Sequence, residues 1–156
     1  MNTLPPPTLE HLCDLAVQIG PAIEVGQTAM GVRRVIPITG GIVKGPLLEG
    51  HILPGGADFQ LIVDGARRAH LDARYVLELR DGSRILVHNS ALRVASPDDS
   101  ARIMRGEPVN PADVYFRCQP RFEASATKWA WLSDHQFVGV GSRLPDAVHL
   151  SFYTVR

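Results

Sequence analysis

The chain has 156 residues, of which 45% are hydrophobic and 21% are charged, a composition typical of a soluble globular domain. Lysine plus arginine and aspartate plus glutamate number 16 each, so no net charge draws the chain toward nucleic acid or an anionic membrane. No apolar run approaches the ~20 residues of a membrane helix and the start of the chain lacks signal-peptide features, so we expect a cytoplasmic protein without nucleic-acid or membrane partners.

Short β-type runs separated by turn residues follow one another along the chain, whose length fits a single domain over residues 1–156 with a flexible proline-rich tail at 1–8. Asp64-Gly65 and Asp81-Gly82 each lie between apolar runs, a hairpin pattern, because a type I′ turn needs positive φ at both central positions. The fold class is therefore predicted as all-β, an antiparallel meander closed into a barrel or folded into a sandwich. Besides the strands that flank these turns, strands are expected within 14–20, 33–43, 45–53, 58–63, 84–94, 114–122, 136–142 and 147–155.

One short helix has clear signals, near Ser96 to Arg105. Ser96 suits the N-cap, Pro97 the first helical position, and Gly106 and Pro108 the end. The helix is expected either to connect strands while covering core or to act as a mobile lid over a cavity. A second short turn or helix is expected over 125–134.

Asp58 stands out because it opens a strand directly after a glycine-rich turn. A two-residue turn at Asp81-Gly82 pairs Tyr75 with His88, and a four-residue loop in the preceding hairpin sets Asp58 opposite Tyr75, which gives one polar row across three strands. An odd loop or a bulge brings Asp58 to the face of Arg74 instead. The plainer alternative is that Asp58 caps amides of the glycine-rich turn.

Neither metal nor cofactor is expected. Cys13 and Cys118 lie far apart and are interpreted as small buried apolar residues. The six histidines show no metal-ligand spacing. The stretch Gly139 to Arg143 is interpreted as strand glycines at a barrel bend, because no helix start follows it as a phosphate loop would require.

Several stretches resemble a known family. They are PITGGIVKGPLLEGHILPGGADFQLIVDG, LDARYVLELRDGSRILV, VYFRCQPRFEAS, WLS and FVGVG, in order between Arg33 and Arg156. They look like uncharacterised protein family 0311, also called domain of unknown function 3237. This resemblance implies a calycin-like antiparallel β-barrel and a homo-oligomer. Some fungal relatives act as isomerases or stereochemical controllers by moving protons on oxygenated ring substrates.

The resemblance carries over residue by residue. The family's GGxD-aromatic turn matches Gly55, Gly56, Asp58 and Phe59, with tryptophan more usual at the last position, and its LDxRY strand includes Arg74 and Tyr75. Its FRxxPxFE strand includes Arg117 and Glu123, and its WLN matches Trp131 and Leu132 but finds Ser133 in place of the amide. His88 belongs to this sequence rather than to the family pattern. The expected catalytic residues are Asp58, Arg74 and Tyr75, and the expected substrate-binding residues are Phe59, His88, Arg117, Glu123 and Trp131.

Two hypotheses about function follow. In the first, a cofactor-independent isomerase or cyclase holds a small oxygenated substrate while Asp58 moves a proton and Arg74 or Arg117 stabilises the developing enolate. In the second, a non-catalytic barrel binds small apolar ligands. A carboxylate and a guanidinium that converge inside the cavity would favour the enzyme, and a purely apolar lumen would favour binding alone.

Overall fold

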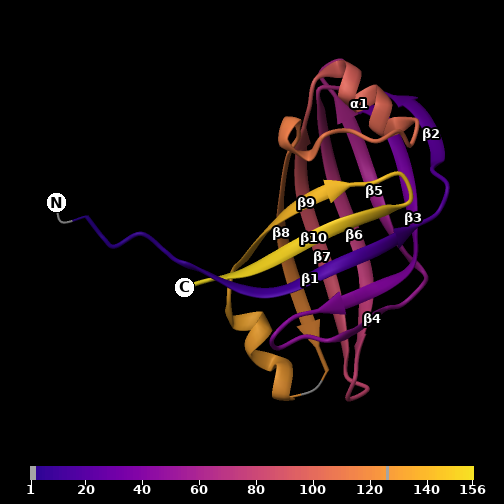
Figure 1. The fold of residues 1–156 in the computed structure, drawn as a ribbon. Helices are drawn as coiled ribbons and strands as arrows, with labels where there is room; N and C mark the ends of the chain where they lie inside the picture. Colours follow the sequence, from indigo (N-terminus) through magenta and orange to yellow (C-terminus); the bar gives the residue numbers. More distant parts are fainter. Residues whose placement is uncertain (1–2, 126) are drawn as a thin grey trace.

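The computed structural model describes residues 3–125 and 127–156, and most of them lie in strands of one antiparallel sheet (Figure 1). Eight strands close into a barrel in the order β1, β3, β5, β6, β7, β8, β9, β10, because β1 pairs with both β10 and β3. Two more strands, β2 and β4, pair alongside β3. The strands are β1 (Leu9–Ile19), β2 (Ile23–Thr28), β3 (Gly31–Lys44), β4 (Gly50–Ile52), β5 (Gly56–Val63), β6 (Arg68–Leu79), β7 (Arg84–Val94), β8 (Tyr115–Ala124), β9 (Phe137–Arg143) and β10 (Ala147–Val155). The predicted all-β barrel is confirmed.

Alternating side chains fill the barrel, since successive residues of a strand point to opposite faces. In β8, Phe116, Cys118, Pro120 and Phe122 are buried, while the residues between them are exposed. An eight-stranded barrel has an interior just wide enough for such side chains to fill. Polar residues at inward positions are therefore exceptions that need an explanation.

Two glycines of β9 make room for aromatic rings. A Cβ atom on Gly139 would lie 2.7 Å from the ring of Phe152, and one on Gly141 would lie 2.8 Å from the ring of Phe116. Both distances are shorter than real Cβ contacts, so a side chain at either position would force the ring or the strand to shift. The glycines lie within a strand, as the sequence predicts, and their role is packing.

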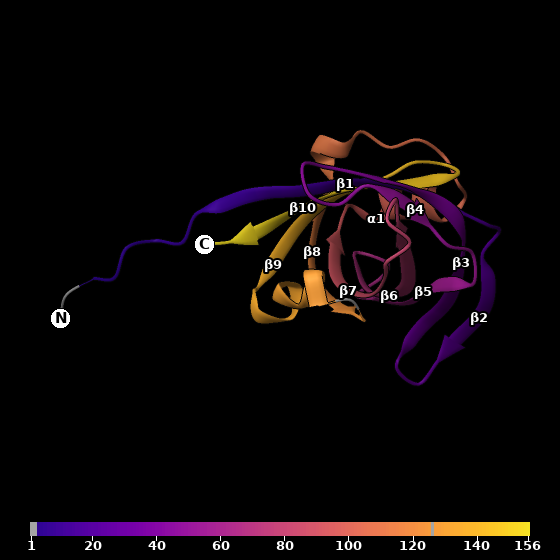
Figure 2. The same cartoon turned by 90° about the horizontal axis from the view of Figure 1, so that it is seen from below.

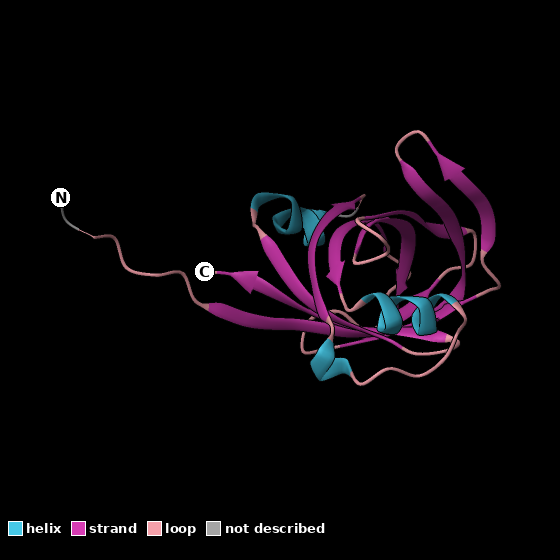
Figure 3. Cartoon of the chain, turned by 90° about the horizontal axis from the view of Figure 1, so that it is seen from above, coloured by secondary structure: helices cyan, strands magenta, loops and turns pink. Residues whose placement is uncertain are grey.

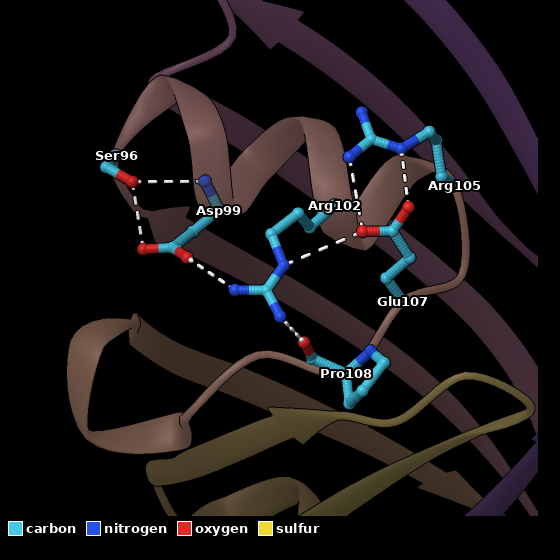
Figure 4. Close-up of polar contacts among 6 residues, drawn as sticks. All are labelled: Ser96, Asp99, Arg102, Arg105, Glu107 and Pro108. Atoms are coloured by element: carbon cyan, nitrogen blue, oxygen red, sulfur yellow. Dashed lines mark hydrogen bonds and ion pairs between the residues drawn. The ribbon is translucent and has the colours of Figure 1, made fainter.

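The predicted helix covers one end of the barrel as α1 (Pro97–Met104), seen from above in Figure 3. Ser96 is its N-cap, with its Oγ accepting from the Asp99 backbone N–H at 3.0 Å. From the last turn of α1, Arg102 donates to the Pro108 carbonyl at 2.7 Å, and Arg105, just after the helix, pairs with Glu107 (Figure 4). These contacts hold the loop beyond α1 against its last turn.

Two 3₁₀ helices complete the chain, η1 (Pro111–Asp113) and η2 (Thr127–Asp134). The second lies at the end of the barrel opposite α1 (Figure 1) and confirms the expected short turn or helix in this region. No helix among the described residues is both long and apolar enough to cross a membrane. Cys13 and Cys118 are free and buried, as predicted.

In the two central hairpins, β5–β6 and β6–β7, the strands pair in a different register from the predicted one. The β6–β7 loop holds three residues rather than two, because the Leu79 backbone N–H bonds to the Ser83 carbonyl, with Gly82 at φ 80°. A shift of one residue sends every side chain to the other face. His88 therefore points outward opposite Arg74, and Asn89 points inward opposite Ala73.

The β5–β6 loop also differs from the expectation. Its four residues, 64–67, set Asp58 opposite Ala73 rather than opposite Tyr75. Ala73 is two residues from the predicted partner Tyr75, and residues two apart point to the same face of a strand. Asp58 therefore keeps the predicted face and shares it with Tyr75. The polar row inside the barrel consists of Asp58, Tyr75 and Asn89, and His88 is not part of it.

Candidate active site in the barrel lumen

The inward side chains enclose a narrow cavity of about 50 Å³ inside the barrel. Figure 2 looks into the barrel from the end opposite α1, where β5, β6 and β7 form one wall. Most of the lining is aliphatic, but six polar or charged side chains interrupt it. These six are Asp58, Gln60, Tyr75, Asn89, Arg93 and Arg143.

Asp58 is held by two hydrogen bonds at the cavity wall. Gln60 Nε2 donates to Asp58 Oδ2 at 2.7 Å, and the backbone N–H of Asp72 donates to Asp58 Oδ1 at 3.0 Å. Gln60 lies two residues further along β5, so both side chains point into the barrel. The carboxylate is thus fixed in orientation, and it borders the cavity rather than capping the glycine-rich turn.

The surroundings of Asp58 change its acidity. Burial raises the pKa of Asp58 above its ordinary value, because a charged carboxylate is poorly solvated there. The bond from Gln60, the charge of Arg93 and the bond from the Asp72 backbone lower the pKa and offset part of this rise. A raised pKa makes the ionised carboxylate a stronger base than that of an exposed aspartate.

Three buried polar atoms facing this cavity lack a hydrogen-bond partner within the described part of the chain. They are Gln60 Oε1, the Tyr75 hydroxyl and Asn89 Oδ1, on side chains that are at most 4% exposed. Leaving such atoms unpaired costs about 1–3 kcal/mol each, so buried polar groups are normally satisfied. Their gathering in one cavity favours polar contents there, water or a ligand.

Arginines supply positive charge toward the α1 end of the lumen. Arg93 is 3% exposed, and we find no ion pair or hydrogen bond of its side chain among residues 3–125 and 127–156. Burial lowers the pKa of Arg93 to about 10, with Arg143 and Arg34 contributing in the same direction and Asp58 opposing them. The guanidinium nevertheless stays protonated at neutral pH and is available to a ligand.

The two neighbouring arginines are engaged elsewhere. Arg34 pairs with Glu24 at 2.8 Å and donates to the Met104 carbonyl of α1 at 3.1 Å. Arg143 donates to the carbonyls of Leu144, Pro145 and Ala147 around the β9–β10 turn. With Asp58 ionised, the cavity lining still carries an excess of positive charge, which favours a ligand oxygen that is or becomes anionic.

The three predicted catalytic residues are only partly brought together. Asp58 and Tyr75 share the cavity, as expected. Arg74 lies outside it with its side chain 63% exposed, and its Nη2 is 3.7 Å from the Asp72 carboxylate. Arg74 follows the inward-facing Ala73, so the alternation of the strand directs it to solvent.

The five predicted substrate-binding residues all lie outside the cavity. Phe59 is 48% exposed on the outer face, and Arg117 stacks over the ring of Tyr115 on the same face. Glu123 is exposed on β8. Trp131 lies in η2 and packs against His135 and Phe137.

His88 belongs to an outer network. Its Nε2 is 2.6 Å from Asp72 Oδ1, and its Nδ1 is 2.8 Å from Nη2 of Arg121. A guanidinium can only donate, so Nδ1 accepts and the proton of the neutral ring is on Nε2, where it is donated to Asp72. The sequence predicted His88 in the polar row with Asp58 and Tyr75, and this is wrong, because the β6–β7 loop holds one residue more than the predicted turn.

Gln60, Asn89 and Arg93 were missed by the sequence reasoning. Asn89 and Arg93 lie on the same face of β7 as the buried residues Ile85 and Val87, because they lie an even number of residues apart. The sequence signal was therefore two polar residues at positions of the strand where the alternation predicts buried apolar ones. It could be used only with the correct register.

A larger depression of about 660 Å³ lies on the outside of the barrel over β7 to β10, and its lining includes Tyr115, Arg117 and Val140. None of the buried unpaired atoms identified in the described residues belongs to it. The lumen is therefore the better candidate site, despite its smaller volume.

The chain is similar to known proteins over nearly its whole length. The model of a family described as protein of unknown function, DUF3237, matches residues 7–155. A UPF0311 protein of Rhodopseudomonas palustris is 39% identical over 96% of this chain and 98% of its own. The crystal structure of the conserved protein RPA1785 of unknown function from that organism superposes with a TM-score of 0.91 over 99% of this chain and 100% of its own, at 36% identity. A β-barrel-like protein of Acinetobacter baumannii gives a TM-score of 0.86 at 37% identity over the whole of both chains.

A more distant similarity involves an enzyme. The hydroalkoxylation enzyme phnH of Penicillium herquei is 37% identical over 86 residues, which are 55% of this chain and 56% of that one. The crystal structure of an enzyme from the same fungus has a TM-score of 0.73 at 22% identity over the whole of both chains, a likeness that shows the fold alone.

Proposed function

The chain belongs to the DUF3237 family, and we propose that its barrel is a cofactor-independent enzyme, an isomerase or cyclase, that moves a proton on an oxygenated ring or polyketide-like substrate. The observation that carries this proposal is that Asp58 and Arg93 line one cavity and that the charge of each acts on the pKa of the other. A carboxylate and a cation in a low-dielectric lumen are the two groups that enolate chemistry needs.

The chemistry requires only proton movement. Asp58 takes a proton from a carbon next to a carbonyl group, and the electron pair of the broken C–H bond moves to the carbonyl oxygen. Arg93 offsets the negative charge that develops on that oxygen. Protonated Asp58 then returns the proton to another carbon, which isomerises the substrate. In a cyclase, Asp58 instead takes the proton of a substrate hydroxyl while that oxygen bonds to the β-carbon of a carbonyl-conjugated double bond. Protonated Asp58 then gives the proton to the α-carbon of the resulting enolate, which completes the ring.

The partial similarity to a hydroalkoxylation enzyme supports this class of reaction. Hydroalkoxylation adds an O–H group across a carbon–carbon double bond and needs no change of oxidation state overall. The polar lining argues against the alternative, a binding barrel for apolar ligands, because such a ligand would leave the buried polar atoms unpaired.

Space limits the substrate in the present conformation. A cavity of about 50 Å³ is far below the roughly 300 Å³ of a pocket for a drug-sized molecule. A ring substrate would have to displace aliphatic side chains of the lining, whereas a compound of three or four carbons would require little movement.

Isotope exchange tests the proposal. The protein is incubated in D₂O with acetone, hydroxyacetone and dihydroxyacetone, and the loss of protons next to the carbonyl group is followed by NMR. We expect catalysed exchange with at least one ketone and a fall of roughly 10²- to 10⁴-fold for Asp58→Asn, which removes the base while keeping its size. Asp72→Asn, on the outer face, is the matched control and should keep most of the activity. Exchange at the uncatalysed rate with every ketone, or equal rates for wild type and Asp58→Asn, would contradict the proposal.

A further inference from the structure

The amide groups of Gln60 and Asn89 present unpaired oxygen atoms to the lumen, and a hydrogen bond fixes the orientation of the Gln60 amide. Gln60 Nε2 donates to Asp58, so rotating the amide would place Oε1 against a carboxylate oxygen with no proton between them. Asn89 Oδ1 is buried and has no hydrogen-bond partner among the described residues. Both side chains therefore offer acceptors to whatever occupies the cavity.

The register places these acceptors around the reacting groups. Ala73 lies between Asp58 on β5 and Asn89 on β7, and it is paired with both. Strands two apart in a sheet are separated by about 10 Å, so side chains from either side can meet over a small residue between them. Gln60 is the next inward residue after Asp58, and Tyr75 is the next after Ala73.

Charge limits the donors that fit. A ligand that satisfies Gln60 Oε1 and Asn89 Oδ1 must carry N–H or O–H groups. Arg93 and Arg143 line the same cavity and disfavour an ammonium group, so the ligand's donors are neutral, as hydroxyl groups are. Arg93 and the Tyr75 hydroxyl supply donors for an oxygen on the same ligand.

We infer that Gln60 and Asn89 are specificity-determining residues, and that the lumen selects a compound with at least two hydroxyl groups flanking a carbonyl or enolate oxygen. This inference rests on the proposed function only in placing the reacting oxygen at Arg93. It excludes monofunctional ketones and purely apolar molecules as good ligands.

A series of three ketones, called the ladder below because each has one hydroxyl group more than the last, tests the inference by binding alone. Acetone, hydroxyacetone and dihydroxyacetone carry zero, one and two hydroxyl groups on the same carbon skeleton. Their dissociation constants are measured from amide chemical shifts of lumen residues in ¹⁵N-labelled protein. Each hydroxyl should tighten binding by roughly 3- to 10-fold, the range for one neutral hydrogen bond.

Variants assign the steps of the ladder to residues. Gln60→Leu and Asn89→Leu should each remove about one step and leave the affinity for acetone unchanged within roughly twofold. Gln119→Leu makes the same chemical change on the exposed face of β8 and should leave the ladder intact. Asn89→Leu leaves the Gln60 bond to Asp58 in place, so an effect there cannot come from a reoriented Asp58.

The outcomes separate the two proposals. A ladder that is flat, a wild type that binds none of the probes, or leucine variants that keep the full ladder would overturn the inference. A normal ladder without catalysed exchange would leave the inference standing and contradict the proposed proton transfer.

Discussion

The backbone N–H of Asp72 donates to Asp58 Oδ1 at 3.0 Å, although the Asp72 side chain lies on the opposite face of the barrel wall. The Asp72 carboxylate meanwhile contacts His88 at 2.6 Å and faces Arg74. The outer network therefore meets the lumen only through the backbone of β6. Its side chains do not touch the cavity.

The first prediction compares two arginines. Arg74→Ala should keep the exchange activity within about threefold, because an exposed ion pair contributes roughly 0–1 kcal/mol and the guanidinium lies outside the cavity. Arg93→Leu should lower kcat by roughly 10²- to 10³-fold, the usual loss for a group that stabilises an oxyanion. Steady-state kinetics of both variants decide the matter, and a larger loss in Arg74→Ala than in Arg93→Leu would reverse the assignment.

The second prediction concerns stability and pH. Burial raises the pKa of Asp58 in the folded protein above its unfolded value, so the folded state binds more protons between these two values. The wild type should therefore lose stability as pH rises from the ordinary aspartate pKa through the raised one. Asp58→Asn cannot ionise and should escape this loss.

Urea denaturation across pH 3 to 8 measures this effect, with these limits chosen to span roughly one unit below the ordinary aspartate pKa to neutrality. The free energy of unfolding of Asp58→Asn relative to wild type should increase toward neutral pH. A constant difference across the range would show that the carboxyl is not ionising against burial.

The third prediction concerns the glycines of β9. Gly141→Ala places a Cβ 2.8 Å from the ring of Phe116, so either the ring or the strand must shift. We expect a loss of about 1–3 kcal/mol in the free energy of unfolding, the usual cost of overpacking. Ser142→Ala, the next residue in the same strand, should cost less than about 1 kcal/mol. Thermal and urea denaturation measure both variants. Equal losses of stability for Gly141→Ala and Ser142→Ala would contradict the packing role of Gly141.

The fourth prediction concerns metals and thiols. We expect EDTA and a reductant to leave the melting temperature unchanged, because both cysteines are free and no metal was predicted. Burial raises the pKa of Cys13 to about 12 and that of Cys118 to about 11, so neither thiol is a ready nucleophile at neutral pH. Alkylation should follow unfolding, and rapid labelling of the native protein would contradict this arrangement.

Local sequence signals determined the fold to a large extent. The Ser96 cap, Pro97 and Gly106 define α1, and apolar alternation in 84–94 and 147–155 matches β7 and β10 to the residue. Such signals act within one turn or one strand, so they can be read without knowing the partners. The strand β2 carries no such signal and was not predicted.

The composition of the site was decided by the tertiary structure. The family resemblance singled out Asp58, Arg74 and Tyr75, but whether a residue faces the lumen depends on hairpin register, where one extra loop residue exchanges His88 for Asn89. Arg93 became a candidate only when closure of the barrel brought β5 and β7 onto one cavity. Residue chemistry alone indicates which side chains could react, whereas strand pairing, which joins residues far apart in the chain, sets which of them face the same cavity.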